Sequence, residues 1–233
     1  MSIAENLTSV RQAIAQAVAA AVRPADDVQL LAVSKTFGPE AVIEAAQAGQ
    51  VSFGENYLQE ALDKMQAVRV QRPDLSLAWH FIGPTQSNKT RPIAEHFDWV
   101  HSVDREKIAQ RLSDQRPDDL QALNICLQVN VSGEASKSGV APDQLLPLAK
   151  AVMAMPRLRL RGLMAIPEPA ESYEAQRQPF RTLRELQAQL AAQGIATDTL
   201  SMGMSADMVA AIAEGATIVR VGTAIFGKRD YAK

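Results

Sequence analysis

Eight short apolar segments alternate with longer helical segments along this chain, and this alternation constrains the fold more than any other feature. Most of the eight are nearly continuous apolar runs, which is typical of parallel strands covered by helices. In chain order they are QLLAVSK, VSFGEN, LAWHFIG, DWVHSVD, LNICLQVNV, LRLRGLMAI, TLSMGM and TIVRVGTAI. Eight strands in strict alternation favour a closed (β/α)8 barrel over the alternative, an open doubly wound sheet.

An additional amphipathic helix is expected before the first strand, over about residues 3–22. Apolar residues recur there every three or four positions, at Leu7, Val10, Ile14, Val18 and Val22. Only FGKRDYAK follows the eighth strand, so we expect the N-terminal helix to close part of the outer ring. No linker or low-complexity segment divides the chain. We therefore interpret residues 1–233 as one domain, with the barrel over about 28–227.

Composition limits the class of protein. The formal net charge is −2 and the basic residues are dispersed, which argues against a nucleic-acid binder. The single cysteine, Cys126, excludes a disulfide framework, suits a reducing compartment and is expected to be a small buried hydrophobe. The sequence shows no signal peptide and no run long enough to span a membrane, so we expect a soluble cytoplasmic protein. His96, His101 and Cys126 do not form a metal set, and no metal is expected.

Lys35 ends the first predicted strand, and the carboxyl ends of barrel strands form the active face of such folds. Leu31, Val33 and Lys35 alternate onto one face, so Lys35 follows an inward-facing row. Burial disfavours the ammonium form of an amine, and a neutral amine can form a Schiff base with an aldehyde. The alternative is a lysine that extends out of the barrel mouth or pairs with a carboxylate.

The last predicted strand carries a second candidate group. Ile218, Arg220 and Gly222 share one face, and a buried arginine must find an acceptor because it keeps its charge. Gly222 allows close approach of backbone to a ligand, and Thr223 adds a hydroxyl. The loops after strands seven and eight of a barrel are frequent phosphate sites. The alternative is an arginine–carboxylate pair next to a turn glycine.

The seventh segment, LSMGMSADMVAAIAEG, could complete a phosphate site beside the eighth. Gly203 loosens its turn, and Ser205 is expected to cap the helix that follows, where free N–H groups favour an anion. The alternative is a plain helix cap. His80 could stack on a planar ring or be a core histidine. The arginines of RLRLRGL are expected to face outward into solvent, and Lys137 is interpreted as a solvated charge.

Several motifs together resemble those of the YggS/PROSC family of pyridoxal 5′-phosphate (PLP) homeostasis proteins. They cover nearly the whole chain, in the order AVSKT, FGEN, WHFIG with QSNK, VNVSGEASKSG, GLMAI, LSMGMSAD and IVRVGTAIFG. One departure is Thr85, which stands where the family usually has an aliphatic residue. That loop is peripheral to the cofactor in the family, so the departure concerns local packing or partner contacts.

The resemblance implies a fold type III PLP barrel of the alanine-racemase type, without the C-terminal β domain. It implies that Lys35 carries PLP as an internal aldimine and that Arg220 faces the pyridine nitrogen. It also implies that Ser205, Gly222 and Thr223 hold the phosphate. The remaining cofactor-binding residues it suggests are Asn56 near the ring hydroxyl, His80 and Met164 as ring neighbours, and Ser201 and Met204 of the seventh-strand motif.

Three functions compete on this basis: a PLP carrier, an amino-acid racemase of the same fold type, and a Schiff-base aldolase or sugar-phosphate enzyme on an ordinary barrel. Racemases of this type carry a second domain whose tyrosine acts as the opposite base, and none of Tyr57, Tyr173 and Tyr231 lies in an added domain. A Schiff-base aldolase predicts a lysine near strand six, and LRLRGLMAI offers none. We therefore expect a monomeric, non-catalytic PLP carrier that contacts PLP-dependent apo-enzymes transiently. Whether Lys137 or Lys89 forms a second PLP site stays open.

Overall fold

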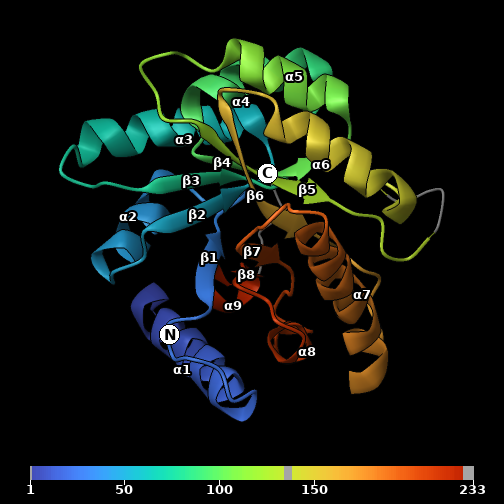
Figure 1. Ribbon diagram of the computed structural model, residues 1–233. Helices are drawn as coiled ribbons and strands as arrows, with labels where there is room; N and C mark the ends of the chain where they lie inside the picture. Colours follow the sequence, from blue (N-terminus) through green and yellow to red (C-terminus); the bar gives the residue numbers. More distant parts are fainter. Residues whose placement is uncertain (1, 134–137, 228–233) are drawn as a thin grey trace.

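The computed structural model describes residues 2–133 and 138–227, and within them eight parallel strands close into a barrel (Figure 1). The strands lie side by side in chain order, and β1 pairs with β8 to complete the ring. Closure confirms the predicted (β/α)8 barrel and excludes the open sheet. Their bounds are β1 Gln29–Val33, β2 Ser52–Glu55, β3 Ala78–Phe81, β4 Trp99–Val103, β5 Leu123–Gln128, β6 Leu158–Met164, β7 Thr199–Ser201 and β8 Ile218–Val221.

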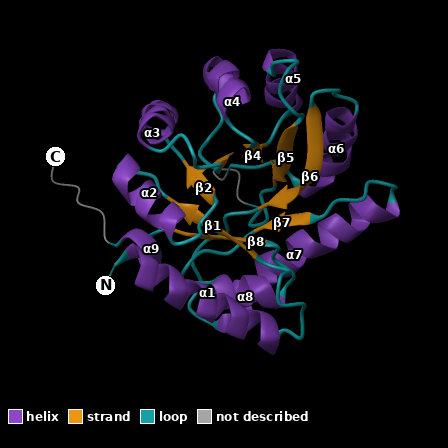
Figure 2. Cartoon of the chain, turned by 90° about the vertical axis from the view of Figure 1, so that its left-hand side faces the viewer, coloured by secondary structure: helices purple, strands orange, loops and turns teal. Residues whose placement is uncertain are grey.

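Helices surround the barrel as an outer ring (Figure 2). In the described part of the chain they are α1 Ile3–Ala20, α2 Pro39–Gln47, α3 Leu58–Gln71, α4 Thr90–His96, α5 Glu106–Gln115, α6 Leu145–Met153, α7 Tyr173–Ala192, α8 Met208–Ala213 and α9 Thr223–Phe226. Short 3-10 turns, η1 Ser87–Lys89 and η2 Pro142–Gln144, precede α4 and α6. Their apolar faces pack on the outside of the sheet and form the larger of two hydrophobic layers.

Helix α1 completes the outer ring, as expected, because it packs against α2, α8 and α9. A capping box between Ser2 and Glu5 starts the helix. It ends at Ala20, two residues earlier than predicted. Val22 has the positive φ of +55° that usually marks the end of a helix, and its side chain is exposed rather than part of the buried stripe.

The barrel interior holds a second, smaller layer. Leu31, Val33, Ile82 and Ile218 fill one side of it, with Trp99 packed against them. Arg161 of β6 also reaches this interior, so the expectation that it faces outward is wrong. Its guanidinium lies 4.5 Å from the centre of the Trp99 ring and bonds Asp198 at 2.9 Å. The reason is alternation along β6: Leu158 and Leu160 pack toward the helices, which turns Arg161 toward the barrel axis.

Candidate functional site

Three neighbouring strands bring the main candidate residues to one end of the barrel. In the register of the sheet, Leu31 of β1 lies opposite Arg220 of β8, and Ile218 of β8 lies opposite Ser201 of β7. Because the strands are parallel, the segments that follow β1, β7 and β8 leave the same face of the barrel. Lys35, Ser205 and Thr223 belong to those segments.

Lys35 lies in a tight turn directly after β1. The N–H of Phe37 donates to the carbonyl of Ser34 at 3.1 Å and closes the turn around Lys35 and Thr36. Lys35 is half-buried there. Leu31 and Val33 face the barrel interior, as the alternation predicted. The turn thus places the lysine at the end of the inward-facing row.

Thr36, the residue after Lys35, has a φ of +70°. Glycine or asparagine usually occupies this left-handed region in such a turn, and a β-branched residue there is an outlier. Backbone strain of this kind costs about 1–3 kcal/mol and persists only where the surroundings enforce it. The N–H of Thr36 donates to Oε1 of Glu60 at 2.6 Å, so α3 holds the strained residue in place.

A buried ion pair lies under the same turn. Nζ of Lys64 donates to Oε1 of Glu55 at 2.7 Å, to Oε1 of Glu60 at 3.0 Å and to the carbonyl of Ser34 at 2.8 Å. The hydroxyl of Ser34 also donates to Glu55 at 2.6 Å. Burial raises the pKa of Glu55, and the charge of Lys64 opposes that shift. All three protons of the Lys64 ammonium have acceptors, which a buried lysine requires.

Arg220 is buried in the barrel interior, as predicted, and the protein itself supplies two acceptors. Nη1 donates to the hydroxyl of Ser201 at 2.8 Å, and Nη2 donates to the carbonyl of Ala165 at 2.9 Å. Burial lowers the pKa of Arg220 to about 10, so the guanidinium stays charged at neutral pH. The predicted alternative, an arginine–carboxylate pair, is wrong: among the described residues, Arg220 donates to a hydroxyl and a backbone carbonyl and not to a carboxylate.

Two buried histidines continue from Ser201 across the barrel. Ser201 Oγ lies 2.8 Å from Nδ1 of His101, and Nε2 of His101 lies 2.9 Å from Nδ1 of His80. His80 stacks on Trp99 with ring centres 5.2 Å apart. Burial lowers the pKa of His80 to about 3 and that of His101 well below its usual value, so both rings are neutral. His80 therefore lies inside the barrel in contact with other rings, and its buried Nε2 has no hydrogen-bond partner among the described residues, unlike that of a satisfied core histidine.

The segment after β7 differs from expectation at its helix. Helix α8 begins at Met208 with Asp207 at the N-cap position, so the expectation that Ser205 caps the helix is wrong. Oδ1 of Asp207 accepts a hydrogen bond from the N–H of Met204 at 2.6 Å, which closes a turn over residues 204–207. Asp207 occupies the N-cap position without a capping bond from its side chain, because its carboxylate is bonded back to Met204, and Gly203 before this turn has a φ of +95°. Met204 and Ser205 are left exposed.

Gly222 and Thr223 lie directly after β8. A Cβ at Gly222 would come within 3.1 Å of the carbonyl of Val33, so a side chain there would crowd β1. Thr223 is exposed and begins α9, whose first N–H groups have no acceptor within the helix. The two residues thus offer an open hydroxyl and backbone donors beside the turn of Lys35.

Met164 ends β6, which pairs with β7, and Asn56 follows β2, which pairs with β1, so the two residues flank the three strands named above. Met164 is fully buried as the last residue of β6. Asn56 comes directly after β2, and its buried Oδ1 has no hydrogen-bond partner. Gly83 approaches Asn56 so closely that a Cβ would lie 2.2 Å from its carbonyl oxygen. Buried polar atoms are normally paired, so this orphaned acceptor marks a place where a ligand donor could bind.

The remaining predicted features lie apart from this site. Thr85 is buried, and its hydroxyl pairs with that of Ser102 at 2.9 Å, which explains how a polar residue fits this loop. Lys89 is exposed at the end of η1. Lys137 lies outside the described residues. Cys126 is buried and free, and burial raises the pKa of its thiol to about 12.

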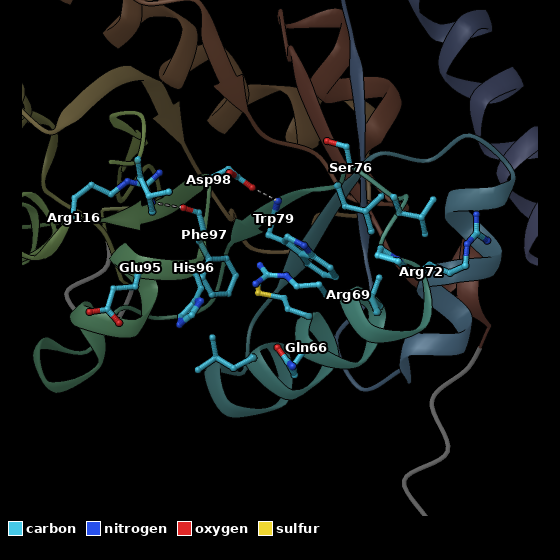
Figure 3. A pocket seen from close by; sticks show the side chains of 17 residues that line it. Gln66, Arg69, Arg72, Ser76, Trp79, Glu95, His96, Phe97, Asp98 and Arg116 are labelled. Carbon is cyan, nitrogen blue, oxygen red and sulfur yellow. Dashed lines mark hydrogen bonds between the residues drawn. The ribbon is translucent and has the colours of Figure 1, made fainter. Parts of the chain in front are cut away.

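A cavity of about 550 Å³ opens elsewhere, at the amino ends of β3 and β4 (Figure 3). Trp79, Asp98 and Arg116 line it together with the last turns of α3 and α4. None of the predicted site residues contributes to it. Within residues 2–133 and 138–227, no group of three or more His, Cys, Asp or Glu side chains could hold a metal ion. No helix of that described part is long and apolar enough to cross a membrane.

Sequence reasoning missed the groups that hold the site from behind. Thr36, Glu55, Glu60 and Lys64 carried no signal in their local sequence, because their contacts join β1, β2 and α3. His101 entered the sequence analysis only as a possible metal ligand, which its spacing excluded. Its role in the barrel interior depends on a contact with Ser201, a hundred residues later in the chain.

Comparison with known proteins identifies the class first. A family profile described as "Alanine racemase, N-terminal domain" matches residues 6–230, which include the whole barrel. Proteins named pyridoxal phosphate homeostasis protein are 63% identical in Pseudomonas aeruginosa, over 99% of this chain and 97% of that one, and 57% identical in Vibrio cholerae, over 100% and 98%. The chain belongs to the family of pyridoxal phosphate homeostasis proteins.

Solved structures agree with this assignment. PipY of Synechococcus elongatus PCC7942, solved with PLP bound, is 38% identical and superposes with a TM-score of 0.83 over 97% of this chain and 100% of its own. Alanine racemase from Corynebacterium glutamicum shares only the fold, at 17% identity and a TM-score of 0.69. The present chain is covered over 99% of its length but spans 62% of that racemase.

Proposed function

We propose that this chain binds PLP reversibly through Lys35 and supplies it to PLP-dependent apo-enzymes, with no catalytic turnover of its own. The observation that supports the proposal is the parallel pairing of β1, β7 and β8, because the segments that carry Lys35, Ser205 and Thr223 then leave the barrel at the same end as Arg220. The names of the relatives and the PLP-bound neighbour support it. Residues 1–233 would form one PLP-binding domain that acts as a monomer in the cytoplasm.

The donor set fits such a ligand. PLP, when bound, would supply an aldehyde that bonds reversibly to an amine. Lys35 would provide that amine from a half-buried position, while Ser205, Thr223 and the backbone at Gly222 would bind the phosphate. Asn56, His80, Met164, Ser201 and Met204 complete the proposed set. Apart from Thr223, Met204 and Ser205, which are exposed and leave a path for release, these residues are buried or half-buried.

Arg220 supports a binding role rather than catalysis. A guanidinium that remains charged at neutral pH cannot supply a proton to a ring nitrogen facing it, and its charge disfavours protonation of that nitrogen. The hydrogen bonds to Ser201 and Ala165 hold Arg220 in this position independently of a ligand. Without a protonated ring, carbanion chemistry at the site is weakly supported.

The direct test is reduction of the PLP-treated protein with borohydride, followed by mass mapping of its peptides. We expect a phosphopyridoxyl group on the peptide that holds Lys35, little on other lysines, and loss of the product in Lys35→Ala. Label spread over surface lysines would overturn the binding site. The loaded protein should restore activity to a PLP-dependent apo-enzyme, whereas racemisation of amino acids by the pure protein, lost in Lys35→Ala, would overturn the non-catalytic role.

A further inference from the structure

The turn that carries Lys35 is held on both sides by charged groups of β2 and α3. On the amino side, the carbonyl of Ser34 accepts from Nζ of Lys64, and its hydroxyl donates to Glu55. On the carboxyl side, the N–H of Thr36 donates to Glu60. Lys64 bonds both carboxylates, so a single ammonium connects the two attachments.

Two of the charged groups behind the turn are deeply buried. The side chains of Lys64 and Glu55 are 2% and 0% exposed, so the ion pair is taken out of water. A buried pair of charges contributes little net stability, because its attraction mainly offsets desolvation. The turn it holds also contains Thr36 in a left-handed conformation. Burial of these charges and strain in the backbone both cost free energy, and both occur beside the candidate reactive lysine. This indicates that the backbone at Lys35 must keep a defined geometry.

We propose that Glu55, Glu60 and Lys64 are positioning residues that fix the direction in which Lys35 leaves the backbone toward the cofactor. The proposal rests on the proposed function. The bond they serve forms between Nζ of Lys35 and the aldehyde carbon of PLP, and the aldehyde oxygen leaves as water. Because Ser34 and Thr36 are held in place, the backbone of Lys35 already has a fixed direction before the amine reacts.

Glu60 is the residue to change, because its side chain is 36% exposed and its loss leaves the Lys64–Glu55 pair intact. Glu60→Ala removes the acceptor for Thr36, whereas Glu60→Gln keeps an oxygen at that position. Glu95→Ala is a matched control: Glu95 is 37% exposed, forms an ion pair with the residue four positions earlier and lines the distant cavity. Lys64→Met removes the central ammonium, and urea unfolding establishes whether that variant folds.

Two ligands separate positioning from support of the fold. PLP requires the lysine bond, whereas pyridoxine 5′-phosphate has no aldehyde and tests the noncovalent contacts alone. We expect Glu60→Ala to slow bond formation with saturating PLP about tenfold, since misplacement of a reacting group has effects of this order or larger. Binding of pyridoxine 5′-phosphate should stay within about twofold, and Glu60→Gln and Glu95→Ala should react like the wild type. A folded Lys64→Met should be slowed at least as much as Glu60→Ala.

Unchanged PLP kinetics in Glu60→Ala would overturn the proposal. A parallel loss of pyridoxine 5′-phosphate binding would also overturn it, because the residues would then support the fold of the whole site. If the wild-type protein gives no borohydride-trapped product on Lys35, the proposed function falls first and the positioning role falls with it. If Lys64→Met does not fold, the comparison of Glu60→Ala with Glu60→Gln tests the positioning role on its own.

Discussion

Several residues in the barrel interior are polar, although close packing of the interior does not require polar side chains. His80, His101, Ser201 and Arg220 form a continuous hydrogen-bonded series through a region that barrels commonly fill with branched aliphatic side chains. Arg220 donates to Ser201, which leaves the Ser201 proton free to point at Nδ1 of His101. His101 can then donate from Nε2 to His80, so the charge of Arg220 favours one tautomer for both rings.

The two histidines make stability depend on pH. Both are neutral in the folded protein, with the pKa of His80 at about 3, whereas an unfolded histidine has its usual value near 6.5. The unfolded chain therefore takes up protons first as the pH falls. This contribution to stability is complete above pH 6.5 and is lost as the pH falls toward 3, by up to about 1.4 kcal/mol per pH unit for each histidine.

Urea unfolding at pH 7.5, 6.5 and 5.5 measures this effect. We expect the free energy of unfolding to fall below pH 6.5, and His101→Gln to reduce the slope by about half of the histidine contribution. His96→Gln changes an exposed histidine and should leave the slope as it is. Glu55, whose pKa burial raises, works in the opposite direction, so the comparison between variants carries the prediction. Equal slopes in wild type and His101→Gln would contradict it.

Gly83 has no room for a side chain. Because an added Cβ would lie 2.2 Å from the carbonyl oxygen of Asn56, Gly83→Ala must displace backbone rather than a flexible side chain. We expect the free energy of unfolding to fall by about 2 kcal/mol, typical of overpacking, as measured in urea. The displacement should also weaken PLP binding, since Asn56 belongs to the proposed site. A variant as stable as the wild type would show that the two strand ends separate easily.

Elements are joined by charges as well as by apolar packing. The carboxylate of Glu214, after α8, is fully buried and contacts Arg177, Arg181 and Arg184 of α7 at 2.7, 3.1 and 2.9 Å. These three arginines lie one turn apart on the same face of the helix. They connect the long helix α7 to the end of the short helix α8, so the turn before β8 is held against the outer ring of helices.

Glu214→Gln should therefore loosen α8. We expect a loss of about 1–2 kcal/mol in the free energy of unfolding, less than for a fully buried pair because the arginines are 30–46% exposed and can be hydrated. Asp118→Ala removes an ion pair whose carboxylate is 89% exposed and should have no measurable effect in the same urea titration. Equal losses in the free energy of unfolding for Glu214→Gln and Asp118→Ala would contradict the prediction that burial of the carboxylate sets the size of the effect.

Which parts of the molecule could be predicted depends on how local their causes are. The strands, Lys35 and Arg220 were predictable because alternation within a few residues sets which side chains face the barrel. Lys64 was not, because its sequence reads as a surface charge on a helix and only the packing of α3 against β2 buries it. Arg161 and Ser205 were wrongly interpreted for the same reason: a partner across the barrel and a turn at Gly203 decide their places.

At the scale of the whole molecule, ligand binding should stabilise the folded state by mass action. With PLP at about 100 times its dissociation constant, the free energy of unfolding should rise by about 2.7 kcal/mol. Thermal unfolding with and without PLP measures the rise, and light scattering should give the mass of one chain in both states. Lys35→Ala should lose most of the rise, whereas the exposed Lys89→Ala should keep it. A rise retained in Lys35→Ala would place the ligand elsewhere.

The stacked rings inside the barrel have an optical consequence. The chain has two tryptophans: Trp79 borders the cavity at the amino ends of the strands, while Trp99 lies against His80 in the interior. Tryptophan emission overlaps the absorption of a pyridoxal chromophore, so energy transfer from Trp99 should dim its fluorescence when the site fills. In a Trp79→Phe variant, Trp99 is the remaining tryptophan, so its fluorescence would measure how much of the site is filled without an added label. The release of PLP could then be followed in real time.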